Sequence, residues 1–260
     1  MRITLIGSGN VATHLAAALK NAGHAIVQVY SRNMQNAALL AYHVKAEAID
    51  DLKAINTDTD LFIIAIKDDA IGPIAEQLAR HQKLMVHTSG ATNLYSLLAF
   101  SDNVGVFYPL QTFSKTKEVD FRNVPVCIEA NDEAIAKALK ELAQTISNKV
   151  YHIDSEKRKA LHLAAVFVCN FPNYLYTIAQ QIIAKQDLNF ELLRPLILET
   201  AEKVQNADAA KVQTGPAIRN DENTMAMHQQ LLEGEPQLQQ LYSLLSQGII
   251  KLDDTQRGDK

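Results

Sequence analysis

The sequence predicts an α/β protein in which a doubly wound, mostly parallel sheet is followed by an all-helical C-terminal domain. Up to about residue 153, short β-like runs alternate with helical patterns, which is typical of a sheet built from βαβ units. After Asp154 the patterns are helical alone. We therefore expect two domains, one over residues 1–153 and one over residues 154–260.

The predicted strands are short apolar runs, and one of them is apolar at every position. This run, Leu61–Ile66, is expected at the centre of the sheet, where helices cover both faces. A weaker strand pattern lies near Val44–Ala48. The other predicted strands are Arg2–Ile6, Ala25–Tyr30, Leu84–His87, Gly105–Phe107, Val124–Ile128 and Val150–Ile153, and the helical patterns between strands include Val11–Ala22, Ile71–His81 and Asp132–Ser147.

A long helix is predicted to open the second domain. Asp154 or Ser155 can cap its start, and the helical pattern continues to about Lys185. Pro172 lies inside this helix and removes one backbone hydrogen bond, so we expect a kink near Phe171. The further predicted helices are Phe190–Asn206, Asp221–Leu232 and Gln237–Leu252.

Composition and charge exclude several classes of protein. Of the 260 residues, 47% are hydrophobic, which is typical of a globular rather than a disordered chain. The net charge is −4 without a basic stripe, so nucleic acid is not an expected partner. The two cysteines lie in apolar runs, so neither a disulfide nor a metal site is expected. We find neither a signal peptide nor a run of 18 apolar residues, so we expect a cytoplasmic protein without a membrane partner.

A glycine-rich motif directly follows the first predicted strand. Residues 7–12 read Gly-Ser-Gly-Asn-Val-Ala, match the pattern G-x-G-x-x-G/A, and open a predicted helix. In this context the glycines permit a tight turn and bring the backbone close to a pyrophosphate at the helix N-terminus. The motif therefore predicts a Rossmann domain that binds a dinucleotide. The alternative is a turn kept for packing alone.

The end of the second strand favours a phosphorylated cofactor. An acidic residue there would bind the ribose 2′-hydroxyl of NAD, whereas this sequence has Ser31 and Arg32. A hydroxyl and a guanidinium suit a 2′-phosphate, so we predict NADP(H) as the cofactor. The alternative for Arg32 is a solvated loop cation. With the residues that end the fourth strand included, the candidate cofactor-binding residues are Gly7, Ser8, Gly9, Asn10, Val11, Ser31, Arg32, Ile66 and Lys67.

Polar side chains also follow the fifth and sixth predicted strands, at the sheet edge where open α/β folds bind ligands. His87 and Ser89 follow the fifth strand and are candidates for polarising a carbonyl or an imine. Tyr108 and Gln111 follow the sixth strand and are candidates for the substrate cleft. Turn capping is the alternative for residues at these positions.

Two further candidates, His162 and Asn170, interrupt an apolar stretch of the long helix near the predicted kink. At about 100° per residue, Asn173 lies about 20° from His162 and Asn170 lies about 80° from it. His162 is the leading candidate for a general acid because imidazole titrates near neutral pH, and Asn170 would orient the substrate. A core histidine is the alternative.

A last polar cluster follows the Gly-Pro loop at residues 215–216. Asp221, Thr224 and His228 fall on one helical face, and Arg219 precedes them. The cluster is either the edge of a substrate cleft or a helix start with a structural Arg–Asp pair. Its spacing matches no familiar set of metal ligands.

These motifs together resemble a family of Rossmann-like proteins with a C-terminal domain of unknown function 2520, labelled as NADP or deazaflavin-coenzyme oxidoreductase-like. The matching segments are residues 7–12, 87–90, 108–113, 162–170 and 215–228. More widely, the chain is similar to pyrroline-5-carboxylate reductase, ketopantoate reductase and the β-hydroxyacid dehydrogenases, which work on substrate in a cleft between two domains. It departs from the family at Tyr108, where histidine is frequent, and it lacks the Lys-x-x-x-Asn motif of the β-hydroxyacid dehydrogenases.

The resemblance implies hydride transfer, so we expect an NADP(H)-dependent oxidoreductase that acts on a small carbonyl or imine substrate bound between the two domains. The alternatives are a non-catalytic NADP(H)-binding sensor or scaffold, and a reductase that uses a deazaflavin coenzyme with NADP. The second domain holds more apolar residues than one buried face needs, so a homodimer is expected. A packed helical core is the alternative explanation of the same residues. The apolar residues in question are Leu192, Leu193, Leu196, Ile197 and Leu198.

Overall fold

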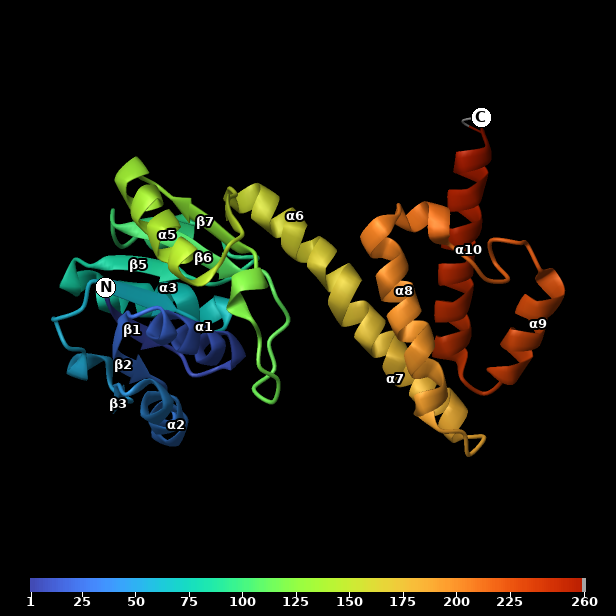
Figure 1. The fold of residues 1–260 in the computed structure, drawn as a ribbon, viewed down its shortest axis with the longest axis horizontal. Helices are drawn as coiled ribbons and strands as arrows, with labels where there is room; N and C mark the ends of the chain where they lie inside the picture. The colour runs from blue at the N-terminus through green and yellow to red at the C-terminus, as the bar shows by residue number, and fades with distance from the viewer. Residues whose placement is uncertain (259–260) are drawn as a thin grey trace. The chain divides into compact units, whose positions relative to one another are not determined.

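The computed structural model describes the backbone of residues 1–258 and the side chains as far as Leu252. The chain divides into two compact units, Met1–Tyr176 and Thr177–Lys260. The first unit therefore holds every strand of the described chain together with the first part of the long helix (Figure 1). Our sequence-based boundary at 153/154 follows the last strand, whereas the compact units divide inside the long helix.

The first unit is built on one eight-stranded sheet, with the strand order β3-β2-β1-β4-β5-β6-β7-β8. All neighbouring strands are parallel except β6 and β7, which are antiparallel. The direction of winding reverses between β1 and β4, which is the position where open α/β sheets bind their ligands. The strands are β1 Arg2–Ile6, β2 Ala25–Tyr30, β3 Glu47–Ile49, β4 Leu61–Ile64, β5 Leu84–His87, β6 Val104–Pro109, β7 Val126–Ala130 and β8 Val150–His152.

Two apolar clusters, one on each face of this sheet, form the core of the first unit. Successive residues of β4 alternate between them: Leu61 and Ile63 belong to the cluster under α1, α2 and α5, and Phe62 and Ile64 to the cluster under α3 and α4. This alternation explains why the run is apolar at every position. The helices that cover the two faces are α1 Asn10–Asn21, α2 Met34–Val44, α3 Ile71–Leu78, α4 Tyr95–Leu98 and α5 Glu133–Ile146.

Several predicted element boundaries need correction. Strand β4 ends at Ile64 rather than Ile66, so the next residues leave the sheet. Strand β6 runs to Pro109, because it pairs with β7 along its whole length. The third strand is Glu47–Ile49, displaced from the predicted Val44–Ala48 because α2 continues to Val44.

Helices follow β8, as the sequence predicts. The N-cap of α6 is Asp154, whose side chain accepts a hydrogen bond from the Lys157 backbone. Next to the predicted kink at Phe171, the long helix contains one π-helical turn, and α7 continues directly from it with Pro172 in its first turn. The angle of the kink stays a prediction. The elements are α6 Ser155–Ala165, the π turn Val166–Asn170, α7 Phe171–Ala184, α8 Arg194–Asn206, α9 Glu222–Leu231 and α10 Pro236–Gly258.

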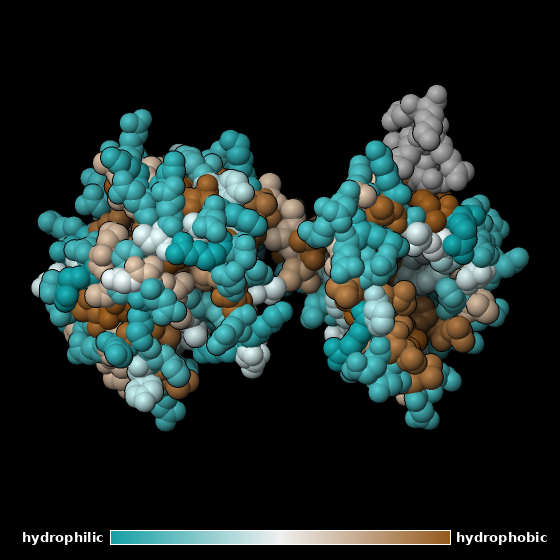
Figure 2. Space-filling model, viewed as in Figure 1, coloured by the Kyte–Doolittle hydropathy of each residue, from teal (hydrophilic) through white to brown (hydrophobic). Residues whose placement is uncertain are grey.

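The second unit is held together by polar contacts between its helices. The Lys185 ammonium pairs with the Glu235 carboxylate at 2.6 Å, and the Gln229 side chain bonds to the Ser243 hydroxyl at 2.8 Å. Hydrophobic side chains remain visible on the surface of this unit (Figure 2). In the described part of the chain, no helix is long and apolar enough to cross a membrane.

Candidate functional site

The glycine-rich turn between β1 and α1 has a backbone that requires glycine. Gly7 has φ = +120°, and a Cβ atom placed there would lie 2.2 Å from the Ala65 carbonyl oxygen. The backbone just after β4 can therefore approach the turn closely because Gly7 has no side chain. Gly9 precedes α1, and a Cβ atom there would meet open space. The turn thus leaves room for a ligand at the helix N-terminus, as pyrophosphate binding needs.

A cleft of about 1010 Å³ begins at this turn and extends along the ends of β2 and β4. The structure brings together seven of the nine predicted cofactor-binding residues in its lining, with Asn33, Asn36 and Asp69 as polar residues that our sequence analysis missed. Two of the lining residues contact each other: Ser8, after β1, donates from its Oγ to the Oγ of Ser31, after β2, at 3.0 Å. The seven residues are Gly7, Ser8, Gly9, Ser31, Arg32, Ile66 and Lys67.

The remaining two predicted cofactor residues do not line this cleft. The Asn10 amide nitrogen donates to the Phe113 carbonyl oxygen at 2.9 Å, which ties the start of α1 to the segment between β6 and β7. Val11 packs against the hydrophobic core. Both residues therefore support the turn from behind the cleft.

A second cavity, of about 460 Å³, lies between the end of β6 and the long helix. It brings together four residues that the sequence singled out from different segments: Tyr108, Gln111, His162 and Asn170. The rest of its lining is mostly aliphatic, and the lining includes no aspartate, glutamate, lysine or arginine. The cavity therefore suits a neutral, largely apolar group.

The π turn explains why Asn170 rather than Asn173 lines this cavity with His162. On a regular α-helix Asn170 would lie about 80° from His162. A π turn adds one residue to the turn and shifts the following residues by about 100°, so Asn170 comes to within about 20° of His162. Sequence periodicity alone could not show this shift.

His162 is held by two contacts inside the first unit. Its Nδ1 lies 3.1 Å from the Tyr108 hydroxyl, and the two rings meet edge to face with centroids 6.1 Å apart. The ring also packs against Gly90, where a Cβ atom would lie 2.7 Å from the His162 Cγ and Nδ1 atoms. The absence of a side chain at Gly90 is therefore what lets His162 lie against the loop that follows β5.

The loop after β5 gives His87 and Ser89 structural contacts. His87 is completely buried, and its Nδ1 accepts a hydrogen bond from the Ser89 backbone at 3.2 Å. Burial, with a contribution from the Arg158 charge, lowers the pKa of His87 to about 3, so its ring is neutral near pH 7. The Ser89 hydroxyl accepts hydrogen bonds from the backbone of Ala91 and Thr92. Their predicted roles in catalysis stay predictions.

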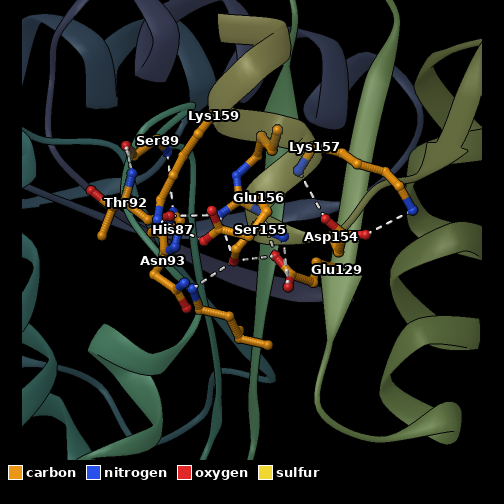
Figure 3. A network of polar contacts seen from close by, with 12 residues as sticks. His87, Ser89, Thr92, Asn93, Glu129, Asp154, Ser155, Glu156, Lys157 and Lys159 are labelled. Atoms are coloured by element: carbon orange, nitrogen blue, oxygen red, sulfur yellow. Dashed lines mark hydrogen bonds and ion pairs between the residues drawn. The ribbon is translucent and has the colours of Figure 1, made fainter.

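A buried ion pair attaches the start of the long helix to the sheet (Figure 3). The Arg158 guanidinium is fully buried and pairs with the Glu129 carboxylate of β7, whose side chain is 12% exposed. Arg158 also donates to the Thr92 carbonyl oxygen, and the Ser155 hydroxyl donates to Glu129 at 2.8 Å. The pair thus joins β7, α6 and the loop after β5. Our sequence analysis missed it.

The polar cluster of the second unit forms helix contacts of its own. Asp221 caps α9: its carboxylate accepts hydrogen bonds from the Thr224 backbone at 3.1 Å and hydroxyl at 2.8 Å. These bonds, with the charges of Arg219 and His228, lower the pKa of Asp221. His228 Nδ1 lies 2.9 Å from the Tyr242 hydroxyl of α10. The contacts agree with the structural alternative, and the predicted role of these residues in a substrate cleft stays a prediction.

Among the described residues, no group of three or more histidine, cysteine, aspartate or glutamate side chains is arranged to hold a metal ion. Cys127 and Cys169 are both free thiols.

Comparison with known proteins covers both parts of the chain. Residues 2–90 match the family described as NADP oxidoreductase, coenzyme F420-dependent, and residues 124–249 match a domain of unknown function, DUF2520. A proposed NADP oxidoreductase from Bacteroides fragilis is 46% identical, with a TM-score of 0.92 over 96% of this chain and 98% of that chain. No curated protein matches the sequence.

Two more distant solved structures share the fold. An imine reductase from Myxococcus stipitatus in complex with NADP+ is 13% identical, with a TM-score of 0.64 over 99% of this chain and 95% of its own. A pyrroline carboxylate reductase from Plasmodium falciparum with NADP bound is 15% identical, with a TM-score of 0.58 over 97% of this chain and 98% of its own.

The fold, the glycine turn and these matches define an NAD(P)-binding oxidoreductase class with a Rossmann-like sheet and a helical C-terminal region. Within that class, the chain belongs to the family of NADP oxidoreductases that carry the C-terminal domain of unknown function 2520. The family resemblance seen in the sequence is therefore confirmed.

The Arg158 ion pair makes a prediction about stability. Replacing Arg158 by alanine leaves the buried Glu129 carboxylate without its partner, so the free energy of unfolding should fall by about 3–5 kcal/mol. Urea unfolding followed by far-UV circular dichroism measures the change. The matched control is Lys159→Ala, which breaks an exposed ion pair with Glu156 and should cost less than about 1 kcal/mol. Equal, small losses in both variants would contradict a supporting role for Arg158.

Proposed function

We propose that this protein is an NADP(H)-dependent oxidoreductase that interconverts a small carbonyl or imine compound and its reduced form. The observation that carries the proposal is the cavity at His162, which lies in the same compact unit as the glycine-turn cleft. When bound, NADPH supplies the hydride, and the protein's own part is to bind, orient and handle the accompanying proton.

The glycine-turn cleft supports the choice of NADP(H). The Gly7–Gly9 turn can receive the pyrophosphate at the N-terminus of α1, and a side chain at Gly9 would project into open space. Ser31 and Arg32 line the cleft just beyond β2, where they can bind a 2′-phosphate with a hydroxyl and a guanidinium. The exposed Lys67 ammonium adds a second cation to the lining.

The cavity at His162 supports the proposed proton transfer. His162 Nδ1 is engaged with Tyr108, so Nε2 is the nitrogen that can meet a substrate oxygen or nitrogen. Asn170 is placed on the same face and can hold the substrate by hydrogen bonds. The uncharged, mostly aliphatic lining favours a carbonyl or imine attached to a neutral group. His87 does not line this cavity, and its predicted role in polarising a substrate stays a prediction.

We also propose that the protein is a homodimer, joined through its helical unit. Described by itself, this unit leaves five leucines at least 45% exposed on three of its helices. Large apolar side chains that a folded unit leaves exposed support an interaction surface. These residues are Leu196 and Leu198 of α8, Leu231 of α9, and Leu244 and Leu245 of α10.

The cofactor assignment predicts selective loss of NADPH affinity when Arg32 changes. Arg32→Asp should weaken NADPH binding by about 10- to 100-fold, because a charge-assisted contact to the 2′-phosphate is replaced by repulsion, and should hardly change NADH binding. Isothermal titration calorimetry with both nucleotides measures the two affinities. Arg122→Asp is the matched control, since that exposed arginine does not line the cleft. Equal losses for NADPH and NADH would exclude the assignment.

The role of His162 predicts a loss of turnover without a loss of cofactor binding. Once a panel of neutral carbonyl and imine compounds yields a substrate, His162→Ala should lower kcat by about 10²–10⁴-fold, with NADPH affinity unchanged. NADPH oxidation, followed by absorbance, measures the rate, and His152→Ala removes an exposed imidazole as the control.

Other outcomes of this assay select the alternatives. Unchanged turnover in His162→Ala would make His162 a core residue. NADPH binding by the wild type without turnover of any compound would favour a sensor or scaffold. Because residues 2–90 match a coenzyme F420-dependent family, the assay is also run with a deazaflavin coenzyme added. NADPH oxidation that depends on this coenzyme would make it the second substrate.

The homodimer proposal predicts the mass of the protein in solution. Sedimentation equilibrium at micromolar concentration should give twice the chain mass of 28.8 kDa. Leu196→Glu together with Leu198→Glu should shift the protein towards monomer, because two charges would be buried at the interface. Exposed Leu39→Glu, on α2 of the other unit, is the control. A wild-type monomer would exclude the proposal.

A further inference from the structure

Tyr108 and His162 form a contact that joins the sheet to the long helix inside one compact unit. Tyr108 comes from β6 and His162 from α6, 54 residues later, and their hydroxyl and Nδ1 atoms lie 3.1 Å apart. Gly90 lies against the same edge of the imidazole, since a Cβ atom placed there would meet Cγ and Nδ1. These contacts fix which edge of the ring points inward and which edge is available to the cavity.

The chemistry of the tyrosine decides where the hydrogen of the neutral histidine lies. Burial raises the pKa of Tyr108 to about 12, so its hydroxyl keeps its proton at neutral pH. A buried hydroxyl needs an acceptor, and a neutral imidazole offers one at its unprotonated nitrogen. Tyr108 can therefore donate to Nδ1, an arrangement in which the hydrogen of neutral His162 lies on Nε2.

The same hydroxyl can also serve the charged form of the histidine. When His162 is an imidazolium, its Nδ1–H donates and the Tyr108 oxygen accepts. If Nε2 then gives its proton to a substrate oxygen or nitrogen, the neutral ring carries its hydrogen on Nδ1 for a short time, and Nε2 takes a new proton from solvent, which restores the imidazolium. The resting neutral form, with its hydrogen on Nε2, arises instead when the imidazolium loses the Nδ1 proton to solvent. Tyr108 loses no proton in this cycle. The ring therefore keeps one orientation in both charge states.

We propose that Tyr108 is a positioning residue that turns His162 Nδ1 inward and leaves Nε2 as the nitrogen that exchanges protons with the cavity. The proposal deepens the proposed function, on which its catalytic meaning rests, but the orientation of the ring is a property of the chain itself. Other titratable groups near the pair are Cys169, which lines the cavity, and Cys127 and Arg158, which act electrostatically on Tyr108. The Arg158 charge is balanced by Glu129.

Nitrogen-15 NMR of histidine-labelled protein tests the proposal without a substrate. A His162→Gln variant identifies the His162 signals. Above the pKa of His162, the wild type should show one tautomer, with the hydrogen on Nε2 and Nδ1 shifted by a hydrogen bond. In Tyr108→Phe the Nδ1 signal should lose this shift and move towards a mixture of tautomers. The control is Tyr95→Phe, which alters a 73% exposed tyrosine and should leave the His162 signals unchanged.

The wild-type spectrum alone can overturn the proposal, so it stays testable if Tyr108→Phe does not fold. A neutral His162 that carries its hydrogen on Nδ1 would exclude Tyr108 as the donor, as would identical His162 signals in the wild type and in folded Tyr108→Phe. With a substrate in hand, Tyr108→Phe should lower kcat by up to about 10²-fold at unchanged NADPH affinity. If the wild type turns over no compound, the proposed function fails while the tautomer result still decides the role of Tyr108.

Discussion

The buried ion pair between Arg158 and Glu129 is the interaction on which the rest of the site depends. It attaches the first turn of the long helix to β7 and to the Thr92 carbonyl, and it does so with a guanidinium that is fully shielded from water. Such a pair is not a large net source of stability, because desolvation offsets its attraction, but losing one partner is costly. It fixes the direction and rotation of α6. His162 lies one turn further on the same helix face, so its place over Gly90 follows from the pair.

The cleft and the cavity both arise along the carboxyl ends of the parallel strands. The glycine turn follows β1, Ile66 and Lys67 follow β4, and Gly90 follows β5. Parallel strands end at one edge of a sheet, so the sheet topology alone brings segments that are far apart in the chain together there. The Asn10–Phe113 hydrogen bond then links the cofactor turn to the segment that supplies Gln111 to the cavity. One sheet edge thus supports both halves of the proposed reaction.

The sequence predicted the sheet, the glycine turn and most lining residues, because each carries a local signal such as apolar periodicity or a motif. It did not predict Arg158, which stands between Lys157 and Lys159 and looks like one of three solvated cations. Its burial depends on Glu129, 29 residues earlier, and only the fold brings the two together. The burial of His87 could not be predicted either: its position at the end of a strand suggested chemistry, and the structure adds that its ring is buried and neutral, while its role stays a prediction. The π turn was hidden too, because Pro172 indicates a disturbed helix but not its form.

The glycine-turn cleft and the cavity at His162 differ in charge, and this difference is the clearest reason to assign them different ligands. The cleft at the glycine turn holds one carboxylate, Asp69, but also the Arg32 and Lys67 cations and the N-terminus of α1, which attract phosphate. The cavity at His162 has no lysine, arginine, aspartate or glutamate in its lining, so it offers a phosphate or a free carboxylate no lysine or arginine partner, whereas a neutral carbonyl or imine needs none. A histidine in such surroundings is the group whose protonation matters most. Holding that ring by a phenol, which remains uncharged, orients it without adding a charge to the cavity.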